Sequence, residues 1–318
     1  MKTLSFLEFY EEIGSSDLYE NAYDKKKEKK CKFCSKSSKE TNFNNIPHVV
    51  PELLGKNNCT SNEECDTCNT LFGDFETDLS NFISPYQTLI SQKTKKKIPS
   101  FQSRKKIGEN STTIRNINGT PRINFGNNLT DLVFDYTNKT INFRFKKKKF
   151  KPINVYKCFV KIGLSLCPKE EILKYQKTID WLARVENLDA YINDLPLVLF
   201  RTKFSNKYFT KPSANLYRRK IITIDKTYRP NLSLVVYSGV FVFQIFIPFC
   251  EETEKMDPKE FELQLELFPA FILDKSISND QDKITFQVSE LPIIKYDMNY
   301  YNKVEEDELV AMKYKKLN

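Results

Sequence analysis

Cys31-Lys32-Phe33-Cys34 and Cys65-Asp66-Thr67-Cys68 are two CxxC pairs, and residues 35–64 separate them. Each pair presents two thiolates from a tight turn, and two pairs complete the tetrahedral four-cysteine shell of a structural Zn²⁺. The gap is longer than the roughly 15 to 20 residues of a simple zinc ribbon, so a folded segment must lie between the pairs. The sequence therefore predicts an N-terminal module built around zinc, with the ligands Cys31, Cys34, Cys65 and Cys68.

The other cysteines and the N-terminus indicate a reducing compartment. Cys59, Cys158, Cys167 and Cys250 have no paired spacing, so a disulfide framework is not expected. Carboxylates interrupt the apolar residues of segment 1–12 before the hydrophobic run of a secretory signal can form. No stretch approaches the roughly 18 apolar residues that a membrane span needs. We expect a soluble, cytoplasmic protein with no membrane partner.

The chain contains a single histidine, His48, which excludes every mechanism that needs two. It lies between the CxxC pairs, in the stretch His48-Val49-Val50-Pro51-Glu52-Leu53-Leu54-Gly55, and Asn69 directly follows the second pair. In this order, the motifs of residues 31–85 resemble those of the HNH endonucleases, also called ββα-metal or His-metal finger nucleases. The resemblance is to the branch that carries a four-cysteine zinc knuckle.

The resemblance implies a role for each motif. In the family, the histidine at the end of the first strand deprotonates water, and this role falls to His48. A neutral imidazole with a pKa of about 6.5 suits the task near pH 7. The family's divalent ion, Mg²⁺ or Mn²⁺, sits at the start of the helix, where the resemblance implies that Asn69 holds it. Such an ion acts as a Lewis acid and accepts few protein oxygens.

The position before His48 departs from the family pattern. Many members carry Asp or Glu there as a second metal ligand, whereas this chain has Pro47, which has no side-chain oxygen. Glu52 is the nearest carboxylate that can replace it, and Asp66 and Asp74 are weaker candidates. The histidine that ends the family's motif is also absent, and Asn69 stands in its place.

The family's middle asparagine steadies the histidine loop. Spacing alone does not decide which residue takes this place among Asn57, Asn58 and Asn62.

The predicted fold class is α+β, with a treble-clef ββα-metal module followed by a basic hairpin region and a larger α+β domain. Apolar positions from 65 to 82 recur at three- and four-residue steps, which predicts an amphipathic helix that ends before Pro85. Turn signals between 113 and 145 predict a small antiparallel meander.

Further helices are expected at 5–13, 153–166 and 168–185, and strands at 197–200, 220–224, 232–237, 240–247 and 261–268. The predicted units are an N-terminal helix and charged segment, the HNH domain, a basic connector and a C-terminal domain, at residues 1–30, 31–90, 91–152 and 153–318.

Charge is distributed unevenly along the chain. Residues 1–250 carry 41 basic and 25 acidic side chains, a net charge of +16, whereas residues 251–318 carry 9 and 16, a net charge of −7. Basic residues also follow the predicted active-site helix directly, where they are placed to contact phosphates. The predicted nucleic-acid-binding residues are Lys95, Lys96, Lys97, Arg104, Lys105 and Lys106.

These features favour a metal-dependent DNA endonuclease, with RNA and a homodimer left open. The resemblance to bacterial HNH proteins implies a restriction or anti-phage role. Pro47 motivates one alternative, a catalytically inactive zinc-knuckle module that binds nucleic acid. A third hypothesis is a zinc-stabilised protein-interaction module whose acidic segment 251–318 covers the basic region.

Overall fold

The computed structural model describes the chain in several ranges. The described residues are 5–103, 112–125, 132–137, 140–183, 195–204, 209–220, 227–251, 262–269, 271–277, 284–290 and 293–313. Helices in these ranges are α1 (Ser5–Phe9), α2 (Asp66–Ile83), α3 (Tyr86–Leu89), α4 (Pro152–Leu166), α5 (Lys169–Ile172) and α6 (Gln176–Ala183). Short 3₁₀ turns are η1 (Ser16–Tyr19), η2 (Glu52–Leu54) and η4 (Leu173–Tyr175). None of these helices has both the length and the apolar composition needed to cross a bilayer.

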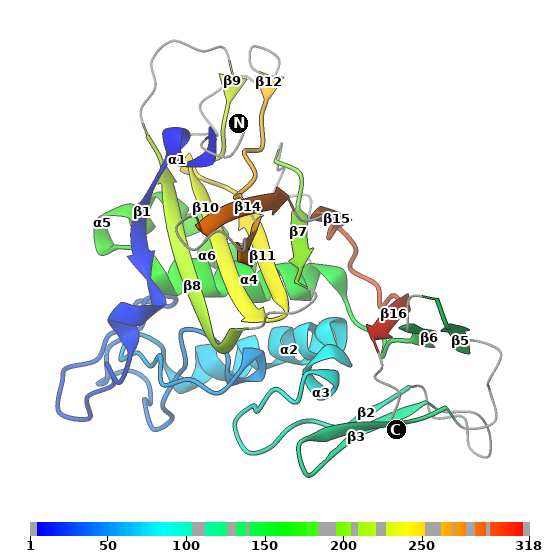
Figure 1. The fold of residues 1–318 in the computed structure, drawn as a ribbon. Helices are drawn as coiled ribbons and strands as arrows, with labels where there is room; N and C mark the ends of the chain where they lie inside the picture. Colours follow the sequence, from blue (N-terminus) through cyan, green and yellow to red (C-terminus); the bar gives the residue numbers. More distant parts are fainter. Residues whose placement is uncertain are drawn as a thin grey trace.

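A six-stranded antiparallel sheet forms the centre of the molecule (Figure 1). Its strands, in spatial order, are β1 (Tyr10–Ser15), β8 (Phe209–Arg219), β10 (Leu232–Gly239), β11 (Phe241–Phe246), β7 (Val198–Lys203) and β15 (Ile293–Asp297). The first strand therefore pairs with a strand about 200 residues later, and Tyr10 lies opposite Arg219. This mixed architecture confirms the predicted combination of helices and strands.

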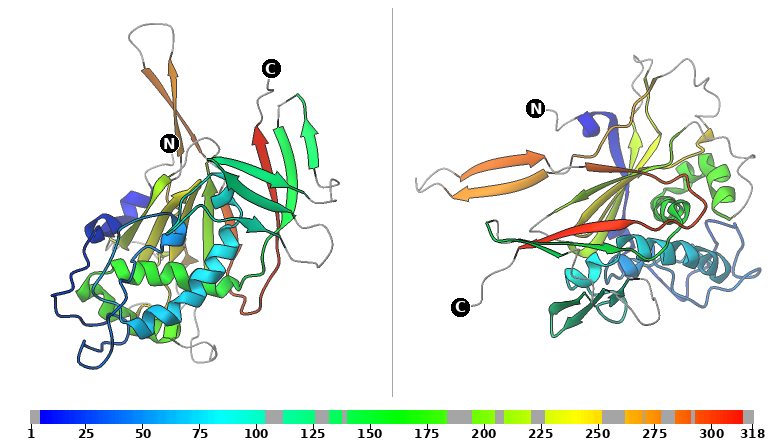
Figure 2. Two further views of the ribbon diagram at one scale, coloured as in Figure 1. Left: turned by 90° about the horizontal axis from the view of Figure 1, so that it is seen from below. Right: turned by 90° about the vertical axis from the view of Figure 1, so that its right-hand side faces the viewer.

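Helix α4 lies between one face of this sheet and α2 (Figures 1 and 2). Every residue of α4 except Asn154 is buried, as expected of a helix that is apolar on all sides. Gly163 permits the close approach to the sheet, because a Cβ there would lie 2.8 Å from Cδ1 of Ile247. The opposite face of the sheet carries a second apolar cluster, in which Phe6 of α1 stacks on Tyr10.

Smaller sheets surround this core. The additional strands are β2 (Phe101–Gln102), β3 (Thr113–Ile117), β4 (Thr120–Asn124), β5 (Leu132–Asp135), β6 (Thr140–Lys146), β9 (Thr227–Tyr228), β12 (Glu262–Leu263), β13 (Phe271–Ile277), β14 (Ile284–Glu290) and β16 (Asp307–Lys313). They form the sheets β2-β3-β4 and β16-β6-β5, the parallel pair β12-β9, and the hairpin β13-β14, which projects from the body in Figure 2. Strand β16 pairs with β6, so a C-terminal strand joins the basic connector.

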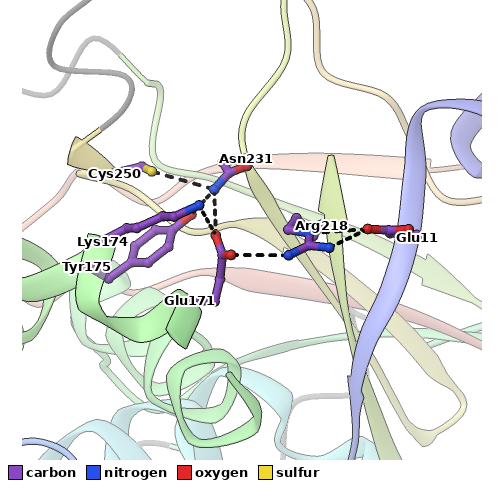
Figure 3. Close-up of polar contacts among 7 residues, drawn as sticks. All are labelled: Glu11, Glu171, Lys174, Tyr175, Arg218, Asn231 and Cys250. Carbon is purple, nitrogen blue, oxygen red and sulfur yellow. Dashed lines mark hydrogen bonds and ion pairs between the residues drawn. The ribbon is translucent and has the colours of Figure 1, made fainter. Parts of the chain in front are cut away.

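A polar network that is buried at Glu171 and Asn231 and exposed at Arg218 and Glu11 joins α5 to the central sheet (Figure 3). The carboxylate of Glu171 accepts hydrogen bonds from Asn231 at 3.0 Å and from Arg218 at 3.4 Å. Arg218, on β8, also forms an ion pair with Glu11 of β1 at 2.6 Å. The network thus joins a helix and two strands that are remote in sequence.

Several predicted elements differ from the structure. The helix expected at 5–13 ends at Phe9, because Tyr10 begins the edge strand β1. The helix expected at 168–185 is divided into α5, η4 and α6. The single meander expected between 113 and 145 is instead two separate sheets. Strand β8 was missed, and the helices expected at 65–82 and 153–166 are confirmed as α2 and α4.

Candidate active site and zinc centre

The four cysteines of the two CxxC pairs converge on one point. All four sulfur atoms lie within 4.8 Å of one another, and the Sγ–Sγ distances of Cys31–Cys68 and Cys34–Cys65 are both 3.7 Å. Zn–S bonds of about 2.3 Å in a tetrahedron require sulfur atoms roughly 3.8 Å apart. The contact with Cys68 lowers the pKa of the Cys31 thiol, whereas burial raises the pKa of Cys34 and the contact with Cys31 raises the pKa of Cys68. The donor set therefore fits a structural Zn²⁺.

Local backbone structure brings the two pairs together. After the first pair, the backbone turns at Ser35, which has a φ of 59° and donates its N–H to the Cys31 carbonyl at 2.9 Å. The second pair starts α2, because Cys65 is its N-cap and accepts the N–H of Asn69 at 2.9 Å. The four clustered cysteines thus bring the start of α2 against the loop that carries the first pair.

His48 lies on a short antiparallel ladder between the cysteine pairs. It forms a bridge with Thr60, and the N–H of Val49 donates to the Cys59 carbonyl at 2.9 Å. Pro47 contributes its backbone carbonyl, which accepts the N–H of Ser61 at 3.1 Å. The ladder holds the backbone of His48 extended while leaving about a fifth of its side chain exposed.

The turn η2 follows His48, and residues outside the cysteine-rich segment hold it by hydrogen bonds. Gln92 and Ser238 both donate side-chain hydrogen bonds to the Leu54 carbonyl, at 2.7 and 2.5 Å. Gly55 has a φ of 141°, and a Cβ there would lie 2.8 Å from Nε2 of Gln92 and 2.9 Å from Cδ of Pro212. The glycine is required because η2 packs tightly against residues of the central body.

Asn57 is the asparagine that holds the histidine loop. Its side chain is 4% exposed, and Nδ2 donates to the carbonyls of Val50 at 3.1 Å and Gly55 at 3.0 Å. Its Oδ1 accepts the N–H of Cys59 at 3.0 Å and lies 3.4 Å from Nδ1 of His48. Among the three candidates, Asn57 is the one that contacts the histidine.

Two acceptors flank the imidazole of His48. Oδ1 of Asn57 faces Nδ1, and the carboxylate of Glu52 lies 3.4 Å from Nε2. The Asn57 oxygen can only accept, so this contact favours a proton on Nδ1, whereas the carboxylate of Glu52 favours a proton on Nε2. Burial lowers the pKa of His48 below its usual range, although the charge of Glu52 opposes this shift. The ring is therefore neutral near pH 7 and able to accept a proton.

A buried ion pair lies behind the histidine. Lys161 of α4 and Glu64 are 2% and 4% exposed, and their Nζ and Oε2 atoms are 2.9 Å apart. The same Nζ donates to the carbonyl oxygen of His48 at 2.8 Å. Burial disfavours the ammonium, but the Glu64 carboxylate outweighs it and raises the pKa of Lys161. Helix α4 therefore supports the histidine from outside the motif region.

Helix α2 carries two oxygen-bearing residues, Asn69 and Glu76, of which Glu76 interacts with the charged groups around His48. Asn69 follows the zinc ligand Cys68, and its side chain is half-buried. Among the hydrogen bonds within residues 5–103, none joins the Asn69 side chain to His48 or Glu52. Glu76 lies two turns further along, and its pKa is raised by burial and by the charges of Glu64 and Glu52, while Lys161 and Lys95 oppose this shift.

The predicted phosphate-binding residues are only partly described. Lys95 has a side chain that is 72% exposed, and its Nζ lies 3.7 Å from Oε2 of Glu52. Lys96 and Lys97 are exposed in the same turn. The other three, Arg104, Lys105 and Lys106, lie outside the described residues. The structure thus brings Lys95, Glu52 and His48 together.

Sequence reasoning missed Lys161, Glu64 and Glu76. A weak signal existed for Lys161, because Lys157 and Lys161 are four residues apart in an otherwise apolar helix. Glu76 is seven residues after Asn69 and so falls on the same helix face. Glu64 gave no signal, because its partner is almost 100 residues away in sequence.

Comparison with known proteins agrees with this geometry. A family model described as HNH endonuclease matches residues 31–80. No curated protein and no solved structure matched the chain. The matched segment contains both cysteine pairs, His48, Asn57 and Asn69. Residues 31–80 therefore carry an HNH endonuclease domain, and their clustered cysteines fit its zinc-knuckle type.

Proposed function

We propose that this chain is a metal-dependent endonuclease that hydrolyses DNA phosphodiester bonds, with His48 as the general base. The observation that carries the proposal is the placement of the neutral imidazole between Asn57 and Glu52, both at 3.4 Å. Oδ1 of Asn57 holds the proton on Nδ1, so Nε2 is the nitrogen that takes a proton from water.

The imidazolium that forms is stabilised on both sides. Its Nδ1–H donates to Asn57 and its new Nε2–H donates to Glu52, so each ring nitrogen faces an acceptor once the proton has been transferred. Lys95 lies beside the same carboxylate and is placed to contact a substrate phosphate. The hydrogen bond from Nζ of Lys161 to the carbonyl oxygen of His48 keeps the backbone of His48 fixed during the reaction.

Oxygen donors at the site suit a hard divalent cation. An amide and a carboxylate are ligands that Mg²⁺ and Mn²⁺ accept, and Asn69 and Glu52 would hold such an ion. When bound, the ion stabilises negative charge on the phosphorane and on the leaving oxygen. Pro47 supplies no ligand, and Glu76 is a further carboxylate in the region.

A plasmid-nicking assay tests the proposal. We expect supercoiled DNA to be nicked with Mg²⁺ or Mn²⁺, EDTA to abolish nicking, and His48→Ala to lower the rate by about 10²- to 10⁴-fold. His48→Gly assayed with added imidazole should regain part of the activity, which separates loss of the base from loss of folding. Equal activity of the wild type and both variants would contradict the proposal.

Two outcomes address the finer parts of the proposal. Salt-sensitive DNA binding without cleavage by the wild type would favour the inactive binding module. A parallel assay on single-stranded and duplex RNA decides between the nucleic acids. The restriction or anti-phage role rests on the resemblance, and plaque counts on bacteria that express the wild type or His48→Ala test it.

A further inference from the structure

The hairpin formed by β3 and β4 carries two arginines directly opposite each other. Arg115 pairs with Arg122 in the antiparallel register, so both side chains emerge on the same face, and both are exposed. The opposite face packs inward through Ile114, which is fully buried, and its partner Ile123. The arginine pair is therefore held at a fixed place on the outer face.

Folding does not explain this pair. Like charges directly opposite each other on antiparallel strands destabilise the hairpin. Among the described residues, no ion pair joins a carboxylate to Arg115 or Arg122. Their neighbours on the same face are the uncharged pairs Thr113–Asn124 and Ile117–Thr120. An external anion that lies between the guanidinium groups would remove the repulsion.

The hairpin is anchored beside the candidate active site. Its turn, Asn118–Gly119, has positive φ at both residues, which gives a tight, well-defined connection. Ser91 donates to the Gly119 carbonyl at 3.0 Å and accepts from Asn116 at 2.5 Å. In Figure 1 the sheet of β2 and β3 lies next to α3, which ends just before Ser91.

The segment that follows this anchor leads back to the histidine. Four residues after Ser91, Lys95 lies 3.7 Å from Glu52, which is 3.4 Å from His48. Residues 91–103 and 112–125, which form this segment and the hairpin, contain basic side chains and no Asp or Glu.

We propose that the β3–β4 hairpin is a DNA-binding arm, and that Arg115 and Arg122 hold backbone phosphates of the duplex whose scissile bond lies at His48. Arginine forks match phosphate oxygens, and two guanidinium groups held on one exposed face can contact neighbouring phosphates of a duplex backbone. This inference rests on the proposed function, because it names the duplex as the substrate of that site.

The test measures binding apart from cleavage. The full chain carrying His48→Ala is titrated onto a fluorescent DNA duplex without divalent ions, over a series of salt concentrations. Adding Arg115→Ser/Arg122→Ser should weaken binding by about 10-fold and reduce the slope of log K against log salt by about 2. Arg115→Lys/Arg122→Lys keeps both positive charges, so its slope of log K against log salt should equal that of the protein with both arginines. The double serine variant should melt at or above the wild-type temperature, because repulsion is removed.

A charge-matched control removes two exposed lysines elsewhere, Lys25→Ser/Lys26→Ser. An unchanged slope in the arginine double variant, or an equal loss in the lysine control, overturns the proposal. If the wild type binds through the arginines but never cleaves, the hairpin assignment stands and the nuclease assignment fails. If the wild type cleaves, Arg115→Ser/Arg122→Ser in a protein that keeps His48 should have a higher KM than the wild type and the same kcat.

Discussion

Lys161 of α4 donates a hydrogen bond from its buried Nζ to the carbonyl oxygen of His48, at 2.8 Å. The two residues are 113 positions apart in the sequence, and the lysine lies outside the segment that matches the HNH family. Because the ammonium also pairs with Glu64 at 2.9 Å, the charge of Lys161 joins α4 to the His48 backbone and to the residues just before α2. The HNH segment is therefore supported by a helix that it does not contain.

Removing this lysine should damage both stability and activity. Lys161→Met leaves the Glu64 carboxylate buried without a partner, and we expect the free energy of unfolding to fall by about 3 to 5 kcal/mol. Lys161→Met/Glu64→Met should recover much of that loss, measured by urea unfolding. Cleavage by the double variant should stay low, because the His48 carbonyl has lost its donor. Full activity of the double variant would show that Lys161 does not position the histidine.

Asn57 and its neighbour Asn58 form a matched pair for mutagenesis. Asn57→Ala leaves the buried carbonyls of Val50 and Gly55 without a donor, so we expect a loss of about 2 kcal/mol or more in unfolding free energy. It should also reduce cleavage, because the His48 tautomer is no longer held. Asn58 is exposed, and Asn58→Ala should change stability by less than about 0.5 kcal/mol. Equal effects of the two changes would contradict the role assigned to Asn57.

Zinc content should depend on the four clustered cysteines. Cys34 is the most exposed of them, so Cys34→Ala should perturb packing least while removing one ligand. We expect the wild type to purify with about one zinc per chain and the variant to lose it, with a clear fall in melting temperature. The control is Cys167→Ala, a buried cysteine outside the cluster. Mass spectrometry of metals measures the zinc content of each protein. Zinc retained by Cys34→Ala would exclude the four-cysteine cluster as the zinc site.

Lys157 should give the stability of the protein a distinctive pH dependence. Burial lowers the pKa of its ammonium to about 8, against about 10.5 when unfolded. Between these values the unfolded chain binds more protons, so the contribution of Lys157 to stability rises as pH increases from about 8 to about 10.5. The gain is at most about 3 kcal/mol. Below pH 8 both states are protonated, and the cost of burying the charge is constant.

The comparison with Lys157→Met isolates this effect from other titrating groups. Urea unfolding of both proteins from pH 7.5 to 10.5 should show the wild type gaining stability relative to the variant. Parallel curves across that range would show that the ammonium is not buried as described. Its Nζ donates to the Trp181 carbonyl at 2.7 Å, so the variant is also expected to loosen α6.

Local patterns of apolar residues predicted some helices well. They failed for segments whose structure depends on pairing with residues far away in the sequence. The apolar spacing of α2 and α4 is strong enough to fix their type and approximate limits. Segment 5–13 has a similar helical pattern, but its second half becomes β1 because β8 offers an unpaired edge. Strand β8 itself escaped prediction, because Pro212, Ser213, Ala214 and Asn215 in the middle of FTKPSANLYRR all have low β propensity.

The sequence by itself determined the zinc ligands, the identity of the only histidine and the helix that follows the second cysteine pair. Thiolate pairs two residues apart and a 3.6-residue apolar period are local properties, so they can be recognised without knowing the fold. Tertiary structure decided which asparagine contacts His48, which lysine supports it and where the arginine pair faces. Those choices depend on burial and on strand register between residues far apart in the chain, because each polar group must find its partner in the folded core.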